Sequence, residues 1–327
     1  MVNDLKDQKA LRSGDASKKR PSVMRRILRR VKAVLGLGIY RRRLKTVRLD
    51  WGVRMKCSSD YSQRRLLEQR QWEPHLTKIF FEVVRPGDLV VDIGANIGYF
   101  SLLASKLVGP EGRVIAFEPS LRCFRRLCEH LFMNKCDNVI PLNMALSDEK
   151  KALELSQPPA YNQGIGTLRP VEDWDKELII ASPLDNILPS ELWARVGLVK
   201  IDTEGWDYFC LQGMRQLLGS HRPVILAEIN SDFYDDLAKM HGEGWTSRRM
   251  IEDFFNFVAS QGYSVNGHVT EGLPAGDGWF RLSTVEEFLD RLTDPRHSTK
   301  DLDLCLVPRG IEVASVQKRA LDVDGGS

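Results

Sequence analysis

Cysteine is scarce in this sequence of 327 residues, and its six cysteines follow no metal-binding pattern. No two stand as Cys-x-x-Cys and no histidine follows them at zinc-finger spacing, which excludes the common structural zinc sites. No apolar run is long enough to span a bilayer, and the polar first 20 residues lack the apolar core of a secretory signal. We therefore expect a cytoplasmic protein with free thiols, and a hydrophobic content of 43% is enough for a sizeable core.

Acidic residues are few at the N-terminus. Residues 1–50 hold 16 Lys and Arg against 4 Asp, a net charge of +12, so the rest of the chain carries −9 of the total of +3. Residues 1–20 predict a disordered basic tail. In the basic arm of residues 21–50, apolar side chains from Met24 to Leu35 recur at helical spacing among arginines. Such a helix favours an anionic membrane surface, here the inner face, or packing on its own domain, and favours nucleic acid less.

The most informative motif is a strand followed by a small-residue turn. The apolar run Leu89–Ile93 predicts a buried strand, and Asp92 precedes a turn formed by Gly94, Asn96 and Gly98. A dinucleotide loop requires Gly-x-Gly-x-x-Gly, but Asn96 stands at the second glycine position and the last glycine comes a residue early. The Asp92 carboxylate would repel a pyrophosphate and attract a sulfonium. The turn therefore predicts S-adenosylmethionine rather than a nicotinamide dinucleotide.

The second strand supplies an acidic residue at its end. The apolar run 113–117 ends at Glu118, which lies 26 residues after Asp92. In a βαβ unit such a residue faces the ribose hydroxyls of a bound nucleoside. Both S-adenosylmethionine and NAD(P) carry this ribose, so Glu118 does not separate them. Two alternatives stay open beside a methyltransferase: an NAD(P)-dependent oxidoreductase, and a non-catalytic membrane-peripheral adaptor with a vestigial cofactor pocket.

Strands and helices alternate along the rest of the chain, which predicts an α/β fold with a mostly parallel sheet covered by helices on both faces. We expect this domain over residues 60–310, a flexible tail over 311–327, and an irregular segment over 151–180 with a hairpin near Gly164–Thr167. The expected strands are 89–93, 113–117, 139–142, 196–201, 223–229 and 303–308, and the expected helices are 74–84, 97–107, 121–134, 184–188, 206–218 and 248–261.

Charged residues follow the fourth expected strand. Lys200, Asp202 and Glu204 stand at its C-terminal end, where open α/β sheets bind ligands, and strand alternation would send all three to one side. They are candidates for catalysis: Asp202 is the first choice to orient or deprotonate an acceptor hydroxyl, and Glu204 the second. Asp202, Glu204 and Glu228 could instead hold a divalent metal through oxygen ligands. A Lys200–Asp202 ion pair that only fixes the loop is the structural alternative.

An ordered set of motifs closely resembles the FkbM-type S-adenosylmethionine-dependent methyltransferases over roughly residues 60–265. In chain order the motifs are Trp72-Glu73-Pro74, Asp92-x-Gly94-Ala95-Asn96-x-Gly98, Phe117-Glu118-Pro119, Ala145-Leu146-Ser147-Asp148, Leu184-Asp185, Lys200-Ile201-Asp202-Thr203-Glu204-Gly205 and Glu228. The resemblance implies a class I methyltransferase (Rossmann-like) fold. It also implies O-methylation of a hydroxyl on a small-molecule, sugar or glycan, or lipid-linked acceptor.

The resemblance further implies roles for individual residues. It assigns Asp92, Gly94, Asn96 and Gly98 to the methionine end of S-adenosylmethionine and Glu118 to its ribose. Ser147 and Asp148 would lie near the adenine. A nucleic-acid acceptor is not expected, because the fourth strand is followed by Asp-Thr-Glu-Gly rather than by the Pro-Pro turn typical of base methylation. The sequence does not indicate the oligomeric state.

Overall fold

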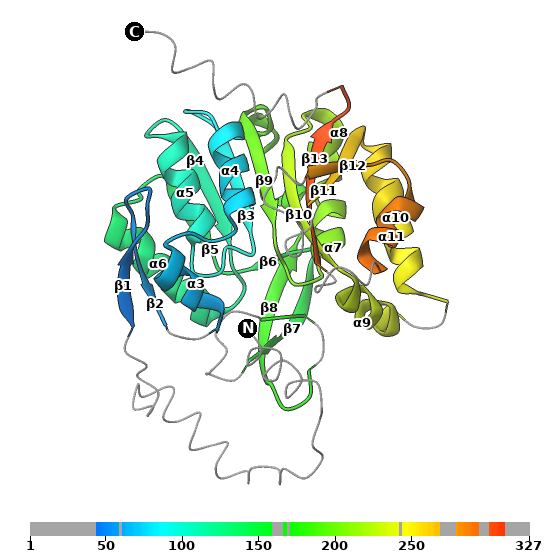
Figure 1. Cartoon of the computed structure of the whole chain (residues 1–327), viewed down its shortest axis with the longest axis horizontal. Coiled ribbons are helices and arrows are strands. Elements are labelled where there is room, and N and C mark those ends of the chain that lie inside the picture. Colours follow the sequence, from blue (N-terminus) through cyan, green and yellow to red (C-terminus); the bar gives the residue numbers. More distant parts are fainter. Residues whose placement is uncertain are drawn as a thin grey trace. The chain divides into compact units, whose positions relative to one another are not determined.

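The computed structural model describes residues 44–58, 61–158, 166–168, 171–241, 244–268, 279–293 and 301–310. They belong to one compact unit that begins at Leu44 (Figure 1). The predicted tails of residues 1–20 and 311–327 and most of the basic arm lie outside the described residues. Within the described part of the chain, no helix combines the length and hydropathy needed to cross a membrane.

An eight-stranded sheet forms the centre of the unit. Its strand order is β12-β11-β13-β10-β9-β3-β4-β5. Strands β5, β4, β3, β9 and β10 are mutually parallel, whereas β13 runs antiparallel to both of its neighbours and β12 antiparallel to β11. Their bounds are β3 Leu89–Ile93, β4 Arg113–Phe117, β5 Val139–Leu142, β9 Val196–Ile201, β10 Val224–Asn230, β11 Tyr263–His268, β12 Trp279–Leu282 and β13 Asp301–Pro308.

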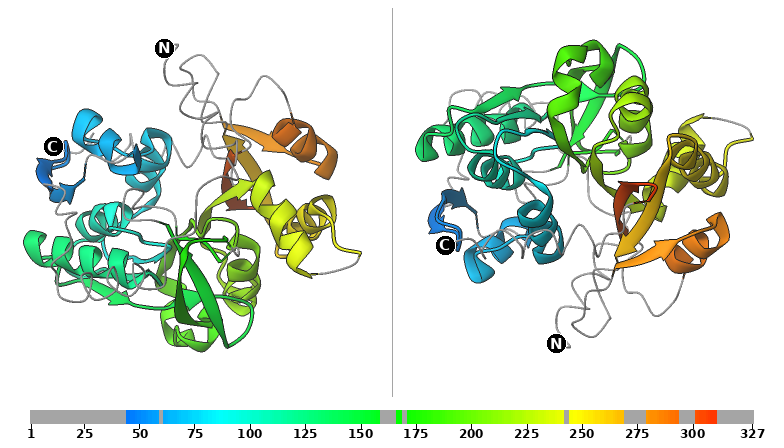
Figure 2. Two further views of the ribbon diagram at one scale, coloured as in Figure 1. Left: turned by 90° about the horizontal axis from the view of Figure 1, so that it is seen from below. Right: turned by 90° about the horizontal axis from the view of Figure 1, so that it is seen from above.

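Helices cover both faces of this sheet (Figure 2). Strand β3 is buried throughout, and its side chains alternate between two hydrophobic clusters: Val91 lies in one and Val90 in the other. The cluster on the Val90 face contains residues of α3 Tyr61–Gln69, α4 Pro74–Val83, α5 Tyr99–Val108 and α6 Leu121–Asn134. The opposite cluster contains residues of α7 Asp207–Gln212, α8 Arg215–Ser220, α9 Ser231–His241, α10 Ser247–Ser260 and α11 Val285–Thr293.

The predicted α/β class with a mostly parallel sheet is therefore confirmed, and most expected elements lie within a few residues of their predicted bounds. Local signals account for this agreement. Pro74 occupies the first turn of α4, and the Ser120 side chain accepts a hydrogen bond from the Cys123 N–H at the start of α6. The expected helix 184–188 is a short 3-10 turn over Leu184–Asn186.

Three expectations differ from the structure. The segment 151–180 holds two strands where irregular structure was expected: β7 Lys151–Gln157 and β8 Asp175–Ser182 pair antiparallel and form a small sheet with β6 Ala145–Leu146. The expected helix 206–218 is two short helices, α7 and α8, and a Cβ at Gly213 between them would lie 2.0 Å from the Ser147 carbonyl oxygen. Part of the basic arm is not helical, since β1 Lys45–Arg48 pairs with β2 Arg54–Cys57. Of the predicted hairpin tip, residues 164 and 165 lie outside the described residues.

Candidate functional site

The carboxyl ends of the parallel strands border a cavity of about 300 Å³. Its walls include the ends of β3, β4 and β9, a residue of β10, the Trp72–Glu73 segment before α4, and residues of α3. The volume is at the lower end of the range of roughly 300–1,000 Å³ that is usual for small-molecule sites. Ligands bind at this edge of open α/β sheets, so the cavity is the candidate site.

Gly94 fixes the floor of the cavity. Its backbone has φ +77°, a conformation that L-residues with a side chain rarely adopt, and a Cβ here would lie 1.9 Å from the Asp202 carbonyl oxygen. The Gly94 N–H donates to the Phe117 carbonyl at 2.9 Å, and the Asp202 N–H donates to the Ile93 carbonyl at 3.0 Å. The ends of β3, β4 and β9 are thus joined through one small-residue turn.

A hydrogen bond joins Asn96 and Glu118 across this turn. Asn96 has φ +50°, and its N–H donates to Glu118 Oε2 at 2.7 Å, while the Ser120 N–H donates to Oε1 at 2.8 Å. Burial, only partly offset by these two hydrogen bonds, raises the Glu118 pKa to about 7. Each carboxylate oxygen keeps a second lone pair, so Glu118 can still accept hydrogen bonds from ligand hydroxyls.

Asp92 lies beneath the turn and does not line the cavity. Its side chain is fully buried, Oδ2 accepts a hydrogen bond from the Ser101 hydroxyl, and Oδ1 lies 4.0 Å from the Lys200 ammonium. Burial raises the Asp92 pKa, and Lys200 opposes this effect. Gly98 also lies outside the cavity lining, at the start of α5. The charge facing a ligand therefore comes from other residues than Asp92.

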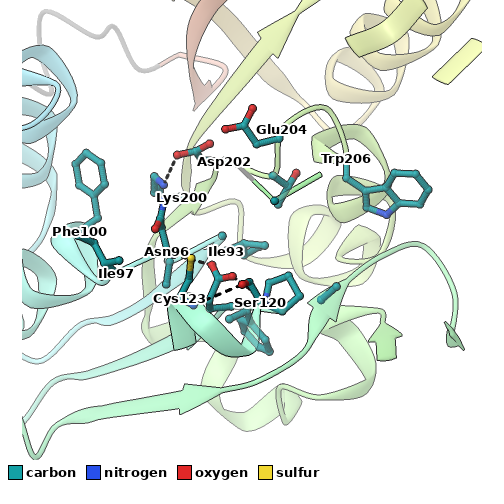
Figure 3. Close-up of a pocket in the computed structure, with 18 of the residues that line it drawn as sticks. Ile93, Asn96, Ile97, Phe100, Ser120, Cys123, Lys200, Asp202, Glu204 and Trp206 are labelled. Atoms are coloured by element: carbon teal, nitrogen blue, oxygen red, sulfur yellow. Dashed lines mark hydrogen bonds and ion pairs between the residues drawn. The ribbon is translucent and has the colours of Figure 1, made fainter. Parts of the chain in front are cut away.

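Lys200 and Asp202 form an ion pair at the cavity wall (Figure 3). The Lys200 Nζ donates to Asp202 Oδ2 at 3.0 Å and lies 5.0 Å from the centre of the Phe100 ring. Burial alone would lower the Lys200 pKa, but the charges of Asp202, Asp92 and Glu73 outweigh it and raise the pKa. Lys200 is thus a fixed cation rather than a proton acceptor. Asp202 remains 30% exposed and lines the cavity.

The loop after β9 brings more side chains to the cavity than strand alternation predicts. Strand β9 ends at Ile201, so strand alternation does not extend to residue 204, and Thr203 lines the cavity together with Asp202 and Glu204. Glu204 adopts φ +54°. Figure 3 places the Glu204 carboxylate beside that of Asp202.

The buried carboxyl of Asp207 holds this loop in place. It accepts a hydrogen bond from the Thr203 hydroxyl at 2.7 Å and another from the Glu228 N–H at 3.3 Å. The loop after β9 is thereby attached to β10. Burial raises the Asp207 pKa to about 6.

Ser147 and Asp148 lie outside the cavity lining, next to Ala145 and Leu146, which do line it, and their assignment to the adenine stays a prediction. The Ser147 hydroxyl is buried, donates to Asp148 Oδ1 at 2.7 Å and accepts from the Trp206 indole N–H at 3.1 Å. Asp148 pairs with Lys151 at 2.9 Å. Ser147 thus holds the side chain of Trp206, which lines the cavity, and Asp148 in turn holds Ser147.

Glu73 lines the cavity, and sequence reasoning did not single it out as a site residue. It adopts φ +40° immediately before α4. Burial, together with the carboxylates of Asp202 and Asp303, raises its pKa to about 8, although Lys200 opposes this effect. The only sequence signal was its place in the Trp72-Glu73-Pro74 motif, because the neighbours that perturb Glu73 are distant along the chain.

The cavity is strongly acidic. Among the described residues that line it, one side chain, Lys200, is cationic, and five carry carboxyl groups: Glu73, Glu118, Asp202, Glu204 and Glu228. The proposed metal set of Asp202, Glu204 and Glu228 is not assembled, however. Within the described ranges, their oxygens do not form a group of three ligand atoms within 4.8 Å of one another, whereas His75, His268 and Asp303 do.

Comparison with known proteins gives a family and several distant similarities. Residues 92–265 match the methyltransferase FkbM domain. Fibrillarin 3 of Arabidopsis thaliana is 34% identical over 90 residues, and protein-L-isoaspartate O-methyltransferase of Methanopyrus kandleri is 42% identical over 57 residues. These segments cover 24% and 16% of this chain, and the chain spans only 29% and 25% of the two relatives.

A solved structure of methyltransferase FkbM from Methylobacillus flagellatus KT is similar at 16% identity and a TM-score of 0.39, covering 74% of this chain and 57% of that one. The family match, in contrast, spans more than half of the present sequence and includes the turn after β3, Glu118 and the loop after β9. The chain therefore belongs to the methyltransferase FkbM domain family.

Proposed function

We propose that the protein is an S-adenosylmethionine-dependent O-methyltransferase that acts on a hydroxyl of a small-molecule, glycan or lipid-linked acceptor. The observation that carries this proposal is the excess of carboxyl groups in the cavity, five against the single ammonium of Lys200. A dianionic pyrophosphate would be repelled by this lining, whereas a ligand with a sulfonium and an ammonium would be attracted. The same excess argues against NAD(P) and against a polyanionic nucleic-acid acceptor.

The residues present fit this cofactor. The main chain of Gly94 and Asn96 would meet its methionine end, and Glu118 would accept hydrogen bonds from the ribose hydroxyls. Apolar side chains would enclose the adenine, with Trp206 beside them in the place that the resemblance gave to Ser147 and Asp148. When bound, S-adenosylmethionine supplies a methyl group on a positively charged sulfur, and transfer to a hydroxyl oxygen leaves one proton to be accepted.

Asp202 is the proposed proton acceptor. Lys200 occupies its Oδ2, which leaves Oδ1 to meet a hydroxyl in the cavity. Lys200 orients this carboxylate and takes no proton itself. Glu204 and Glu73 lie on the same cavity and would orient the acceptor. Positioning of this kind can supply roughly 7–11 kcal/mol of the barrier when reacting atoms are held about 3 Å apart.

The proposal can be tested with S-adenosylmethionine that carries an isotopically labelled methyl group. The purified protein is incubated with small-molecule, glycan and lipid extracts from cells that lack it, and the labelled fraction is identified by mass spectrometry. We expect the label as an O-methyl ether in one of these fractions, and no label with boiled protein. The proposal would be refuted if the label appeared in RNA or DNA instead, or if the protein bound NAD(P) and not S-adenosylmethionine.

A further inference from the structure

Two histidines and an aspartate from three separate elements come together beside the cavity wall. His75 lies in the first turn of α4, His268 ends β11, and Asp303 lies on β13. His75 Nε2 is 2.7 Å from Asp303 Oδ2, and the two imidazole rings stack with their centres 4.3 Å apart. One ligand atom from each residue lies within 4.8 Å of the others, and no second such trio occurs in the described part of the chain.

The strand register, independently of these contacts, puts Asp303 and His268 side by side on one face of the sheet. Asp303 stands opposite Glu228 on β10 and opposite His268 on β11, and His268 stands opposite Trp279 on β12. Residues directly opposite in antiparallel pairs share one face of the sheet. The neighbours of Asp303, Leu302 and Leu304, belong to the cluster on the far face, so Asp303 points to the face that α4 covers.

The cluster also contains a buried nitrogen whose hydrogen-bonding capacity is unused. His268 Nδ1 is buried and has no hydrogen-bond partner. A buried polar atom without a partner is rare in folded proteins and calls for an explanation such as a bound ion.

We propose that His75, His268 and Asp303 bind one divalent transition-metal ion of the zinc class. Two imidazole nitrogens and one carboxylate are a ligand set that zinc and neighbouring transition metals accept, with a further position open to water, whereas magnesium and calcium prefer oxygen ligands alone. The ion would link the start of α4 to β11 and β13. Because Glu73 stands two residues before His75, it would also fix the cavity wall that carries Glu73.

Binding requires two local adjustments. The proton shared by His75 and Asp303 must leave, because a metal about 2.0–2.1 Å from each ligand atom takes its place. One imidazole must also turn out of the stack, since the ring planes differ by only 2° and nitrogen lone pairs lie in the ring plane. Both adjustments involve side chains.

The experiment uses the full chain without a histidine tag, freed of metal with a chelator and titrated with Zn²⁺ in a calorimeter. We expect one ion per chain. His268→Gln and Asp303→Asn should each weaken binding by about 100-fold or more, because loss of even an outer partner of a metal ligand costs roughly 10- to 100-fold. His221→Gln, which changes an exposed histidine elsewhere, is the matched control and should leave binding unchanged.

X-ray absorption of the zinc-loaded unmodified protein keeps the proposal testable should a variant fail to fold. We expect two imidazole nitrogens and a carboxylate oxygen around the ion. No zinc uptake, uptake that the two variants leave intact, or a spectrum with fewer than two imidazoles would overturn the proposal. None of these outcomes bears on the proposed methyl transfer, which is tested by labelled methyl incorporation.

Discussion

At the scale of single residues, two carboxyl groups in the cavity are held partly protonated at neutral pH. Burial raises the pKa of Glu118 to about 7 and that of Glu73 to about 8. A cationic ligand favours the ionised form of both groups. Ligand binding and proton release are therefore linked in this account.

The first prediction concerns this linkage. At low pH both carboxyls are protonated and attract a cation little, so the affinity for S-adenosylmethionine should rise from about pH 6 as they lose their protons. The rise should end near about pH 8, where the α-amino group of the ligand loses its own charge. Calorimetry at pH 7 in buffers of different ionisation enthalpy should record proton release on binding. Glu118→Gln should reduce the number of protons released. An affinity that falls as the pH rises from about 6 to about 7.5 would contradict the account.

The second prediction concerns Asp202. Asp202→Asn preserves shape and a hydrogen-bond acceptor for Lys200 but removes the basic oxygen. If Asp202 accepts the hydroxyl proton, turnover with the acceptor that the labelling experiment identifies should fall by about 100-fold or more, with cofactor affinity nearly unchanged. Asp137→Asn, at an exposed carboxylate, should leave both quantities as they are. Normal turnover in Asp202→Asn would remove this role from Asp202.

At the scale of elements, the turn after β3 is the joint on which the site depends. Gly94→Ala should prevent the turn from closing on β9, because the new methyl group would lie 1.9 Å from the Asp202 carbonyl oxygen. Gly87→Ala is the matched control: Gly87 also has positive φ, at +89°, but nothing lies within 4 Å of its Cβ position.

The two variants should separate conformational strain from collision. The control should lose about 1–2 kcal/mol of unfolding free energy, the cost of a left-handed residue, and keep cofactor affinity. Gly94→Ala should lose more stability and most of its cofactor affinity. Urea unfolding and calorimetry measure both quantities, and equal behaviour of the two variants would disprove a special role for Gly94.

Elements with strong local signals were predictable from the sequence. The buried run 89–93, the capped helix 121–134 and the strand 196–201 all form with those bounds. Strand β8 was not predicted, because its apolar residues are consecutive: Ile179 is buried while Leu178 is 75% exposed, so the burial alternates where the hydrophobicity does not. Only pairing with β7 determines which residues are buried.

The site was predictable only where its residues stand in local sequence motifs. Asn96, Glu118 and Asp202 stand in motifs at strand ends, and the topology brings them to one cavity. Glu73 depends on tertiary contacts with residues more than 100 positions away. The sequence likewise could not reveal that Asp92 lies beneath the turn beside Lys200, so the predicted charge preference is now attributed to the carboxyl groups that line the cavity.

At the scale of the whole molecule, the basic arm and the acidic cavity are separate features. We propose that the arm binds an anionic membrane surface, as the basic amphipathic pattern of residues 21–50 predicts. The β1–β2 hairpin belongs to the folded unit, so the informative truncation begins at Leu44 rather than after residue 50. The full chain should float with anionic vesicles at low salt, and the truncated chain should not. Equal flotation of both would refute this role.

The central claim is that the carboxyl groups that line the cavity, from the segment before α4, the ends of β4 and β9, and β10, select a cationic adenosyl cofactor. Calorimetric titration of the ligand-free protein with S-adenosylmethionine, and separately with NAD and NADP, tests it most directly. We predict saturable one-to-one binding of S-adenosylmethionine and no measurable binding of either dinucleotide. Tight binding of a dinucleotide with no heat from S-adenosylmethionine would contradict the claim.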